Sequence, residues 1–518
     1  MTYGADWTEY GADVVTPDAS EVRFPLDPLW ASSAIDVVGI DYYAPLADWR
    51  DEAGHLDSSI ATSTYDVGYL AGNVYSGEGF DWYYADDAAR AVQDRTPITD
   101  GLGKPWTFRV KDIRSWWSSA HHERISGVEL ASPTAWLPQG KPIWFTEVGC
   151  PAVDKGANQP SVFPDPKSSE NNLPYFSTGY RDDLIQRRYL QAFLGKLDPA
   201  FGAVDADNPV SPVYGGRMID ASAIHLWTWD ARPYPAFPAA TEVWSDGPNW
   251  QTGHWLTGRL GSAPMDALVA SLLADCGVAG ADTSALREAC DGYVIDRPMS
   301  PRAMIEPLAG AYAFDATAAD GTLRFLSRGG APVAEFAEED LVLPDGGAPA
   351  RLTRAQETEL PREAGFGFTD GTVDYRRSAV TSRRLAGGSN RSVHSDLAVV
   401  SDDAAMARRA EVWLQDLWAG RESAAFSLGP QCLSLTAGDV IAVGNHVANF
   451  KVGDRVIASG IGSFAEEKQV PSSAVRLIPG PIDYDVAAGF TAAYLTAYVA
   501  LVRRANLQRG EWLLVHGA

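Results

Sequence analysis

The chain has 518 residues, enough for about three domains of ordinary size, and 46% of them are hydrophobic. Its net charge of −25 argues against nucleic acid or an anionic membrane surface as the main partner. No segment approaches the roughly 20 apolar residues of a membrane span, and the residues after Met1 lack the pattern of a signal peptide. Composition therefore predicts no membrane insertion and no nucleic-acid partner.

Short apolar segments alternate with helical patterns in the first half of the chain. Such alternation predicts an α/β fold with a parallel sheet. The expected strands are Thr2–Trp7, Ile35–Tyr43, Pro142–Val148 and Ala223–Trp229, and the clearest helical patterns are Asp112–Ile125 and Tyr180–Leu197.

The third of these segments is the most informative one. Ile143, Trp144 and Phe145 form the apolar run of a buried parallel strand, and Glu147 follows at its carboxyl end. Barrel enzymes carry their catalytic groups at that end of their strands. The alternative is an ordinary strand that ends in a solvated acid.

Tryptophan is concentrated in the first part of the sequence. All but three of the 17 tryptophans lie between Trp7 and Trp255. Such a density is typical either of a large core or of a groove in which indole faces stack on sugar rings. It predicts a domain boundary near residue 260.

Four quoted segments carry a specific resemblance: YGADWTEY, DPLWASSAIDVVGIDYYAPLADWRD, KPIWFTEVGCPAVDKGANQP and HLWTWDARPYPAFP. They resemble the glycoside-hydrolase-like TIM-barrel domain of gene transfer agent and phage tail proteins, which in turn resembles retaining glycosidases. The resemblance implies a partial (β/α)₈ domain with Glu147 as the catalytic nucleophile. It also implies substrate-binding residues, namely Trp227 and Trp229 as the floor of a sugar site and Trp7, Asp41 and Tyr42 along it. His225 either reaches this site or packs in the core.

The same resemblance leaves the catalytic pair incomplete. The four segments correspond to strands five to eight of a barrel, and the acid of the glycosidases belongs to strand four, which is expected to precede Met1. Retaining hydrolysis needs a second carboxyl group about 5–5.5 Å from the first. Asp6 and Glu9 are the nearest substitutes, so this chain is expected to be inactive in hydrolysis by itself.

The middle of the chain has an α+β pattern without a catalytic cluster. Met265–Cys276 and Asp402–Ala419 are amphipathic helices, and Ser300 is placed to cap a helix that begins at Pro301. The segments GYVIDRP, LAGAYAFDA, DGTLRF and SLTAGDVI resemble the phage tail-tip module that follows the barrel in the same family. Such modules serve as baseplate hub or host-specificity structures. Arg376, Arg377, Arg383 and Arg384 form either an interface or, as we expect, a solvated face.

The C-terminal residues resemble another family. FKVGDRVIASGIGS, AAGFTAAYLTAYVAL and EWLLVHGA are similar to medium-chain dehydrogenases/reductases, in particular quinone oxidoreductases. In that family VHGA leads into the glycine-rich turn that holds the cofactor pyrophosphate. The resemblance to a fragment predicts a chimeric or truncated reading frame rather than an evolved fusion. No cofactor is expected, and NADPH would bind only if this segment were complete.

Cysteine and histidine add little chemistry. Cys150, Cys276, Cys290 and Cys432 include no CxxC pair, so neither a disulfide framework nor a zinc site is expected. His121, His122 and Glu123 suggest metal ligands, but adjacent helical residues point to different faces. We therefore expect a surface helix there and no metal.

These patterns predict three domains: a barrel-like domain over residues 1–260, a tail-tip module over 261–440 and a dehydrogenase-like fragment over 441–518. The leading hypothesis is a structural component of a phage-like or gene transfer agent tail tip with a carbohydrate-facing barrel. Its partners would be other tail and baseplate proteins and a cell-surface glycan, after cytoplasmic synthesis and assembly into the particle. The alternatives are a retaining hydrolase of cell-envelope glycan and an NADPH-dependent quinone oxidoreductase.

Overall fold

The computed structural model describes residues 1–443, except residues 17, 53, 260, 320, 331, 338–339, 344–348 and 386, together with Val456–Ala458 and Val475–Leu477. The chain forms two compact units. One comprises Met1–Ala331, Leu352–Ala424 and Leu435–Val440, and the other comprises Pro332–Arg351, Ala425–Ser434 and Ile441–Ala518.

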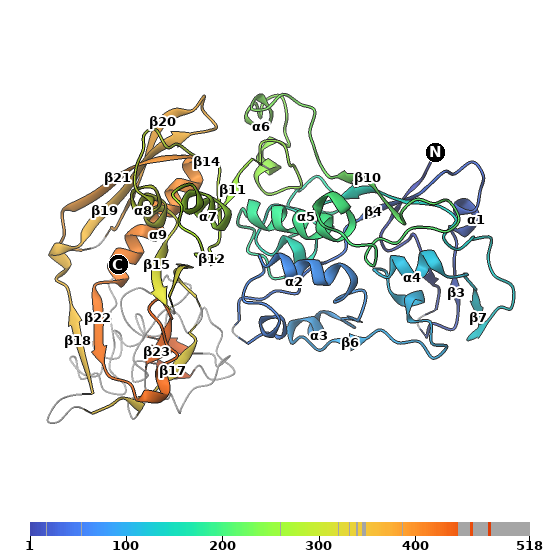
Figure 1. Cartoon of the computed structure of the whole chain (residues 1–518), viewed down its shortest axis with the longest axis horizontal. Helices are drawn as coiled ribbons and strands as arrows, with labels where there is room; N and C mark the ends of the chain where they lie inside the picture. The colour runs from blue at the N-terminus through green and yellow to red at the C-terminus, as the bar shows by residue number, and fades with distance from the viewer. Residues whose placement is uncertain are drawn as a thin grey trace, which may run out of the picture. The chain divides into compact units, whose positions relative to one another are not determined.

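A four-stranded parallel sheet forms in the N-terminal part of the first unit (Figure 1). Its strands follow each other in chain order, and each pairs in parallel with the next. They are β1 (Gly4–Asp6), β4 (Val38–Tyr42), β9 (Ile143–Val148) and β10 (Ile219–Leu226). The predicted α/β class is confirmed, and the sheet is open rather than a closed barrel over the residues that the structure describes.

The longest helix of this region covers one face of the sheet. Helix α5 (Asp183–Leu197) begins at Asp182, whose side chain accepts a hydrogen bond from the Ile185 amide. Its Phe193 ring lies 5.2 Å from the ring of Phe145 on β9. The alternation of buried and partly exposed residues along β9 follows from this packing, because successive strand residues face opposite sides of the sheet.

Smaller elements surround this sheet. Helix α2 packs against α5 (Figure 1). The helices here are α1 (Asp27–Trp30), α2 (Val67–Gly72), α3 (Asp87–Ala91), α4 (Ile113–Ser118) and α6 (Ala236–Ala239). The strands form one sheet of β2 (Asp13–Val14), β3 (Val22–Arg23), β7 (Arg124–Ile125) and β8 (Val128–Glu129), and a pair of β5 (Trp82–Tyr83) and β6 (Thr96–Pro97).

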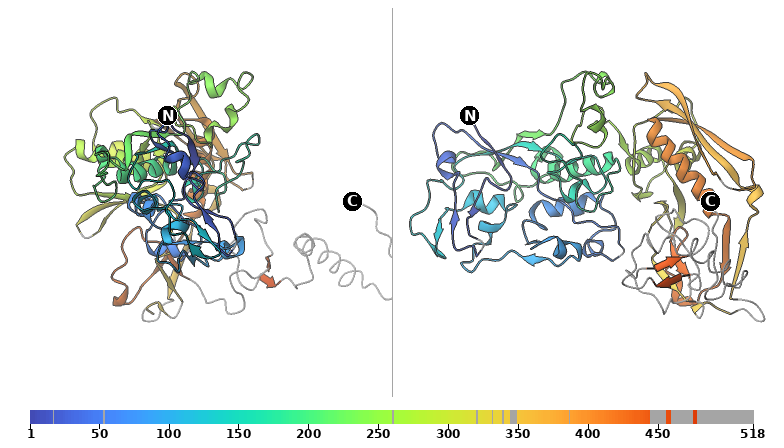
Figure 2. Two further views of the ribbon diagram at one scale, coloured as in Figure 1. Left: turned by 90° about the vertical axis from the view of Figure 1, so that its right-hand side faces the viewer. Right: turned by 180° about the vertical axis from the view of Figure 1, so that it is seen from behind.

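The later part of the same unit is α+β, as predicted. Helix α9 (Asp403–Ala419) packs on a sheet of β14 (Gly292–Tyr293), β21 (Arg391–Ser401), β19 (Pro361–Asp370) and β20 (Arg376–Arg383) (Figure 2). The Ser300 cap of helix α8 (Pro301–Ala311) is confirmed. The remaining elements of this part are α7 (Met265–Asp275), β11 (Ala263–Pro264), β12 (Asp282–Ala285), β13 (Ala289–Cys290), β15 (Phe314–Ala319) and β16 (Thr322–Ser327).

Strands at the unit boundaries and in the second unit are short. Strands β18 (Ala350–Arg354) and β22 (Glu422–Phe426) pair with each other. In the second unit β17 (Ala334–Phe336) pairs with β23 (Ile441–Val443), and β24 (Val456–Ala458) pairs with β25 (Val475–Leu477). The expected cofactor-binding strand at the end of the dehydrogenase-like segment lies outside the described residues. The bounds of the three predicted domains stay predictions.

The predicted helix over Asp112–Ile125 is wrong beyond Ser118. Helix α4 ends there because His121 is drawn into the core, where Nε2 of its ring lies 2.8 Å from the Trp116 carbonyl oxygen. Its Nδ1 lies 2.8 Å from Oδ2 of Asp27, and its ring stacks on Trp136. The expectation of a surface helix for His121–His122–Glu123 is therefore also wrong.

We predict that His121→Ala lowers the free energy of unfolding by about 3 kcal/mol, because the buried Asp27 carboxylate keeps only its Thr134 hydrogen bond and a stacked ring is removed. Urea unfolding followed by tryptophan fluorescence measures this change. His122→Ala is the matched control: its ring is half-buried, with one hydrogen bond to the Leu130 carbonyl. A change at His121 no larger than that of the control would contradict the prediction.

Candidate functional site

The structure places Glu147 at the carboxyl end of β9, between β4 and β10. The register pairs Asp41 with Glu147 and Leu226 with Val148. Residues that follow neighbouring parallel strands meet at the same edge of the sheet, so the segments after Tyr42 and after Leu226 flank Glu147. The predicted geometry of this strand end is confirmed, whereas the catalytic role of Glu147 stays a prediction.

Glu147 is held by a tyrosine that the sequence analysis did not assign to the site. The Tyr43 hydroxyl donates a hydrogen bond of 2.7 Å to Oε2 of Glu147. Burial raises the pKa of Glu147 above its usual value, the Tyr43 hydrogen bond opposes this rise, and the nearby charge of Asp41 adds to it. Glu147 is thus a partly buried carboxyl group that holds its proton more tightly than a free glutamate.

Two carboxylates lie in register with Glu147 along the sheet. Asp6 on β1 is the register partner of Asp41 on β4, and Asp41 is that of Glu147. Asp41 accepts a 2.6 Å hydrogen bond from Thr146 Oγ1. Glu9, the other suggested substitute for a second acid, is exposed and follows β1 outside this register.

Tyr42, which the resemblance assigns to the sugar site, lies in the core of the structure. It is 1% exposed, and its ring lies 4.9 Å from Phe145 and 5.5 Å from Phe193. The reason is the alternation of a strand, which sends Tyr42 to the helix-covered face and leaves Tyr43 for Glu147. The same rule, applied to the sequence, would have selected Tyr43.

Trp7 and His225 also differ from expectation. Trp7 lines a separate small cavity with Trp106 and Trp116, so it does not join the group around Glu147. His225 is exposed on β10, with Nδ1 3.1 Å from the Phe145 carbonyl oxygen and its ring 6.2 Å from that of Trp144. Of the two alternatives for His225, packing in the core does not fit this exposure, and the assignment to the sugar site stays a prediction.

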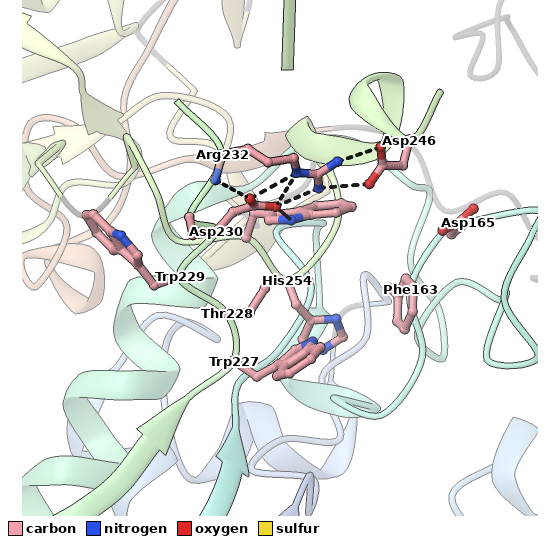
Figure 3. A pocket seen from close by; sticks show the side chains of 11 residues that line it. Phe163, Asp165, Trp227, Thr228, Trp229, Asp230, Arg232, Asp246 and His254 are labelled. Atoms are coloured by element: carbon pink, nitrogen blue, oxygen red, sulfur yellow. Dashed lines mark hydrogen bonds and ion pairs between the residues drawn. The ribbon is translucent and has the colours of Figure 1, made fainter. Parts of the chain in front are cut away.

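A cavity of about 440 Å³ opens beside the end of β10 (Figure 3). Trp227 and Trp229 both contribute to its lining and are 43% and 67% exposed. In Figure 3, Trp227 lies beside His254, whereas Trp229 lies apart from them, beyond the backbone of Thr228. The other lining residues are Phe163, Asp165, Thr228, Asp230, Ala231, Arg232, Asp246, His254 and Trp255.

His254 connects this cavity to Glu147. Its ring packs edge-on against Tyr43 at 5.5 Å and against Phe163 at 5.1 Å. Its Nε2 lies 2.7 Å from the Pro160 carbonyl oxygen, and burial lowers its pKa to about 4. At neutral pH it is therefore an uncharged spacer between the glutamate and the cavity. Sequence reasoning missed it because it lies in a loop more than 100 residues after Glu147.

Other candidate chemistries find little support. The Cys150 thiol is fully buried, and burial raises its pKa, so it is unreactive. Across the described part of the chain, no three His, Cys, Asp or Glu residues gather to hold a metal ion. Within the same residues no helix has the length and apolarity needed to cross a membrane.

A parallel sheet whose strands follow chain order, with a carboxyl group at its carboxyl edge, shares these two features with TIM barrels. Residues 1–238 match the family model of the gene transfer agent (GTA) TIM-barrel-like domain, and residues 300–455 match that of a phage tail protein. Two stretches of the chain are thus similar, in this order along the sequence, to a GTA TIM-barrel-like domain and to a phage tail protein. The second match extends past residue 440, where the sequence predicted a boundary.

One solved structure and several curated proteins are also similar. A chain of the native gene transfer agent virion is 29% identical, over 39% of this chain and 46% of that chain, with a TM-score of 0.37. Human synaptic vesicle membrane protein VAT-1 homolog is 45% identical over 83 residues, and quinone oxidoreductase of Sus scrofa is 39% identical over 84 residues. Each match covers 16% of this chain, and it covers 21% and 26% of those proteins. The resemblance of a short segment of this chain to quinone oxidoreductases is thereby confirmed.

The raised pKa of Glu147 generates a prediction on stability. The folded state binds this proton more tightly than the unfolded chain does, so the stabilising contribution is full below the usual value of 4.5 and is lost as pH rises through the folded pKa. Glu147→Gln, which has no charge to bury, should therefore raise the free energy of unfolding at about pH 7 by at most about 1 kcal/mol.

Denaturant unfolding at about pH 4 and about pH 7 tests this difference. The difference in the free energy of unfolding between Glu147→Gln and the natural chain should shrink at the lower pH, because both side chains are uncharged there. Glu242→Gln, at an exposed position, is the control and should show no such pH dependence. A loss of stability for Glu147→Gln confined to neutral pH would contradict the prediction.

Proposed function

We propose that this tail component binds a cell-surface glycan through the cavity beside β10 and contributes to host recognition at the tail tip. The observation that carries the proposal is the exposure of Trp227 at the wall of a 440 Å³ cavity. An indole left exposed beside polar groups is suited to stack on the apolar face of a sugar ring. The match of residues 1–238 to the GTA TIM-barrel-like domain supports the proposal.

The partners of such a component would be other proteins of the tail and baseplate. The match of residues 300–455 to a phage tail protein supports this assignment. The oxidoreductase-like segment spans 21% and 26% of the two relatives it resembles, and the site belongs to the barrel-like part. The proposed function therefore rests on the first 260 residues.

We predict that Trp227→Ala weakens binding of soluble oligosaccharides by about tenfold or more, because a stacking surface is lost. Chitotetraose and cellotetraose are suitable probes, with binding followed by calorimetry. Phe201→Ala, which removes a 64% exposed aromatic ring outside the cavity, should leave affinity unchanged. Equal affinities of Trp227→Ala and the natural chain, or no binding of either glycan, would refute the proposal.

Retaining glycoside hydrolysis is the second candidate, favoured by the register of Asp41 with Glu147. The two would act as a carboxyl pair, with the proton held on Glu147. However, Asp41 already accepts a hydrogen bond from Thr146, and Glu147 is not part of the cavity lining. We therefore propose binding without turnover.

We expect the purified chain to release no reducing sugar from chitotetraose or cellotetraose above background. General acid catalysis alone is worth about 10²–10⁴-fold, so an assembled carboxyl pair would be readily detected. Hydrolysis that is abolished by Glu147→Gln and by Asp41→Asn, with both variants folded, would establish the enzyme instead. Hydrolysis that persists in both variants would indicate a contaminating enzyme.

A further inference from the structure

The walls of the cavity are aromatic. Trp227 and Trp255 both line it, and Nε1 of Trp255 donates a 3.0 Å hydrogen bond to Oδ2 of Asp230. Phe163 adds a third ring at the margin. Aromatic faces carry partial negative charge and attract cations within about 6 Å of the ring centre. An enclosure of this kind suits a ligand that carries a positive group.

The charged groups of the lining also favour a positively charged ligand. Three carboxylates, those of Asp165, Asp230 and Asp246, share the cavity with the guanidinium of Arg232. The hydrogen bonds from Arg232 lower the pKa of Asp230 and of Asp246, so both carboxylates stay ionised at neutral pH. The lining is therefore acidic in sum.

Arg232 is not available to an anionic ligand. Each of its three guanidinium nitrogens donates to a carboxylate oxygen of Asp230 or Asp246, at 2.6 to 3.0 Å. The guanidinium also lies 3.5 Å above the ring of Phe237. A carboxylated or phosphorylated sugar would have to break these bonds to reach a positive charge.

No second cation of the lining replaces it. His254 is the other basic residue there, and it is buried and uncharged at neutral pH. Lys167 follows Asp165 on the same loop, but its ammonium donates to Ser245 Oγ at 2.6 Å and it does not contribute to the lining. The cavity thus presents rings and negative charge to whatever enters it.

We propose that this cavity recognises an amine-bearing sugar, one whose ammonium group lies between the indoles and Asp165, and that it disfavours sugars carrying carboxylate or phosphate. The inference rests on the carbohydrate binding proposed above and specifies its ligand class. An ammonium gains from both the aromatic faces and the carboxylates. A neutral sugar gains only the stacking, and an acidic sugar meets like charge.

Two oligosaccharides that differ only at nitrogen test this preference. Chitosan tetramer carries free amines, and chitotetraose carries the same backbone with every amine acetylated. We expect the first to bind about five- to tenfold more tightly at about pH 6. The advantage should shrink as salt rises from about 0.05 M to about 0.5 M. Tetragalacturonate, with four carboxylates, should bind most weakly.

A variant of Asp165 identifies the group responsible. Asp165→Asn keeps an oxygen for the hydrogen bond from the Lys167 amide and should reduce the amine preference to about twofold or less. Asp275→Asn, an equal charge change at an exposed position outside the cavity, should leave it intact. Circular dichroism confirms that both variants are folded.

The possible results separate this inference from the function on which it rests. Tight binding of chitotetraose or tetragalacturonate that equals the binding of chitosan tetramer would overturn the amine preference while glycan binding stands. Binding of chitosan tetramer that is insensitive to both Asp165→Asn and Trp227→Ala would show adsorption to the acidic surface at large, and would overturn both proposals. An amine preference lost in Asp165→Asn alone among the charge variants would support the inference.

Discussion

The site depends on one close approach between the loop after β9 and the residues after β10. The Trp227 amide donates to the Val148 carbonyl at 2.7 Å, and the Trp227 carbonyl lies against Gly149, where a Cβ atom would be only 2.4 Å from that oxygen. Any side chain at residue 149 would separate the two segments. Glycine therefore lets the carboxyl group of Glu147 and the indole of Trp227 lie at adjacent strand ends. A comparable approach occurs at Gly39, where a Cβ would be 2.5 Å from the Tyr3 carbonyl oxygen.

Two neighbouring environments result, and they differ in electrostatic character. Around Glu147 a tyrosine hydroxyl and a nearby carboxylate act on a partly buried carboxyl group, and the balance raises its pKa. In the cavity, Asp230, Arg232 and Asp246 neutralise one another in part and fix the rim. The uncharged ring of His254 lies between these environments and adds no positive charge to either. The proposal of binding without turnover rests on this separation, because Glu147 lies outside the lining of the cavity.

Local signals explain which elements could be predicted. Helices α5 and α9 were predictable because aspartate caps precede them and their apolar residues recur on one face. Strand β9 was predictable because Ile143 and Phe145 bury one face. Helix α4 was predicted too long, because the residues that follow it continue the helical periodicity. In the structure His121 instead leaves the helix and packs among Asp27, Trp116 and Trp136. Sequence periodicity cannot distinguish these outcomes, since the competing contacts come from distant parts of the chain.

The sequence by itself determined the parallel α/β class, the α+β region after it, the likeness to tail proteins and the position of Glu147 at a strand end, since each depends on local pattern or on motif. The tertiary structure alone decided which side chains share the site. Tyr42 lies in the core, Tyr43 contacts Glu147, and Trp7 lines another cavity. The cavity beside Trp227 is lined by Phe163, His254 and the Asp230–Arg232–Asp246 cluster. The physical reason is that the face of a strand and the path of a loop are set by long-range packing, and no short segment of sequence encodes its distant neighbours.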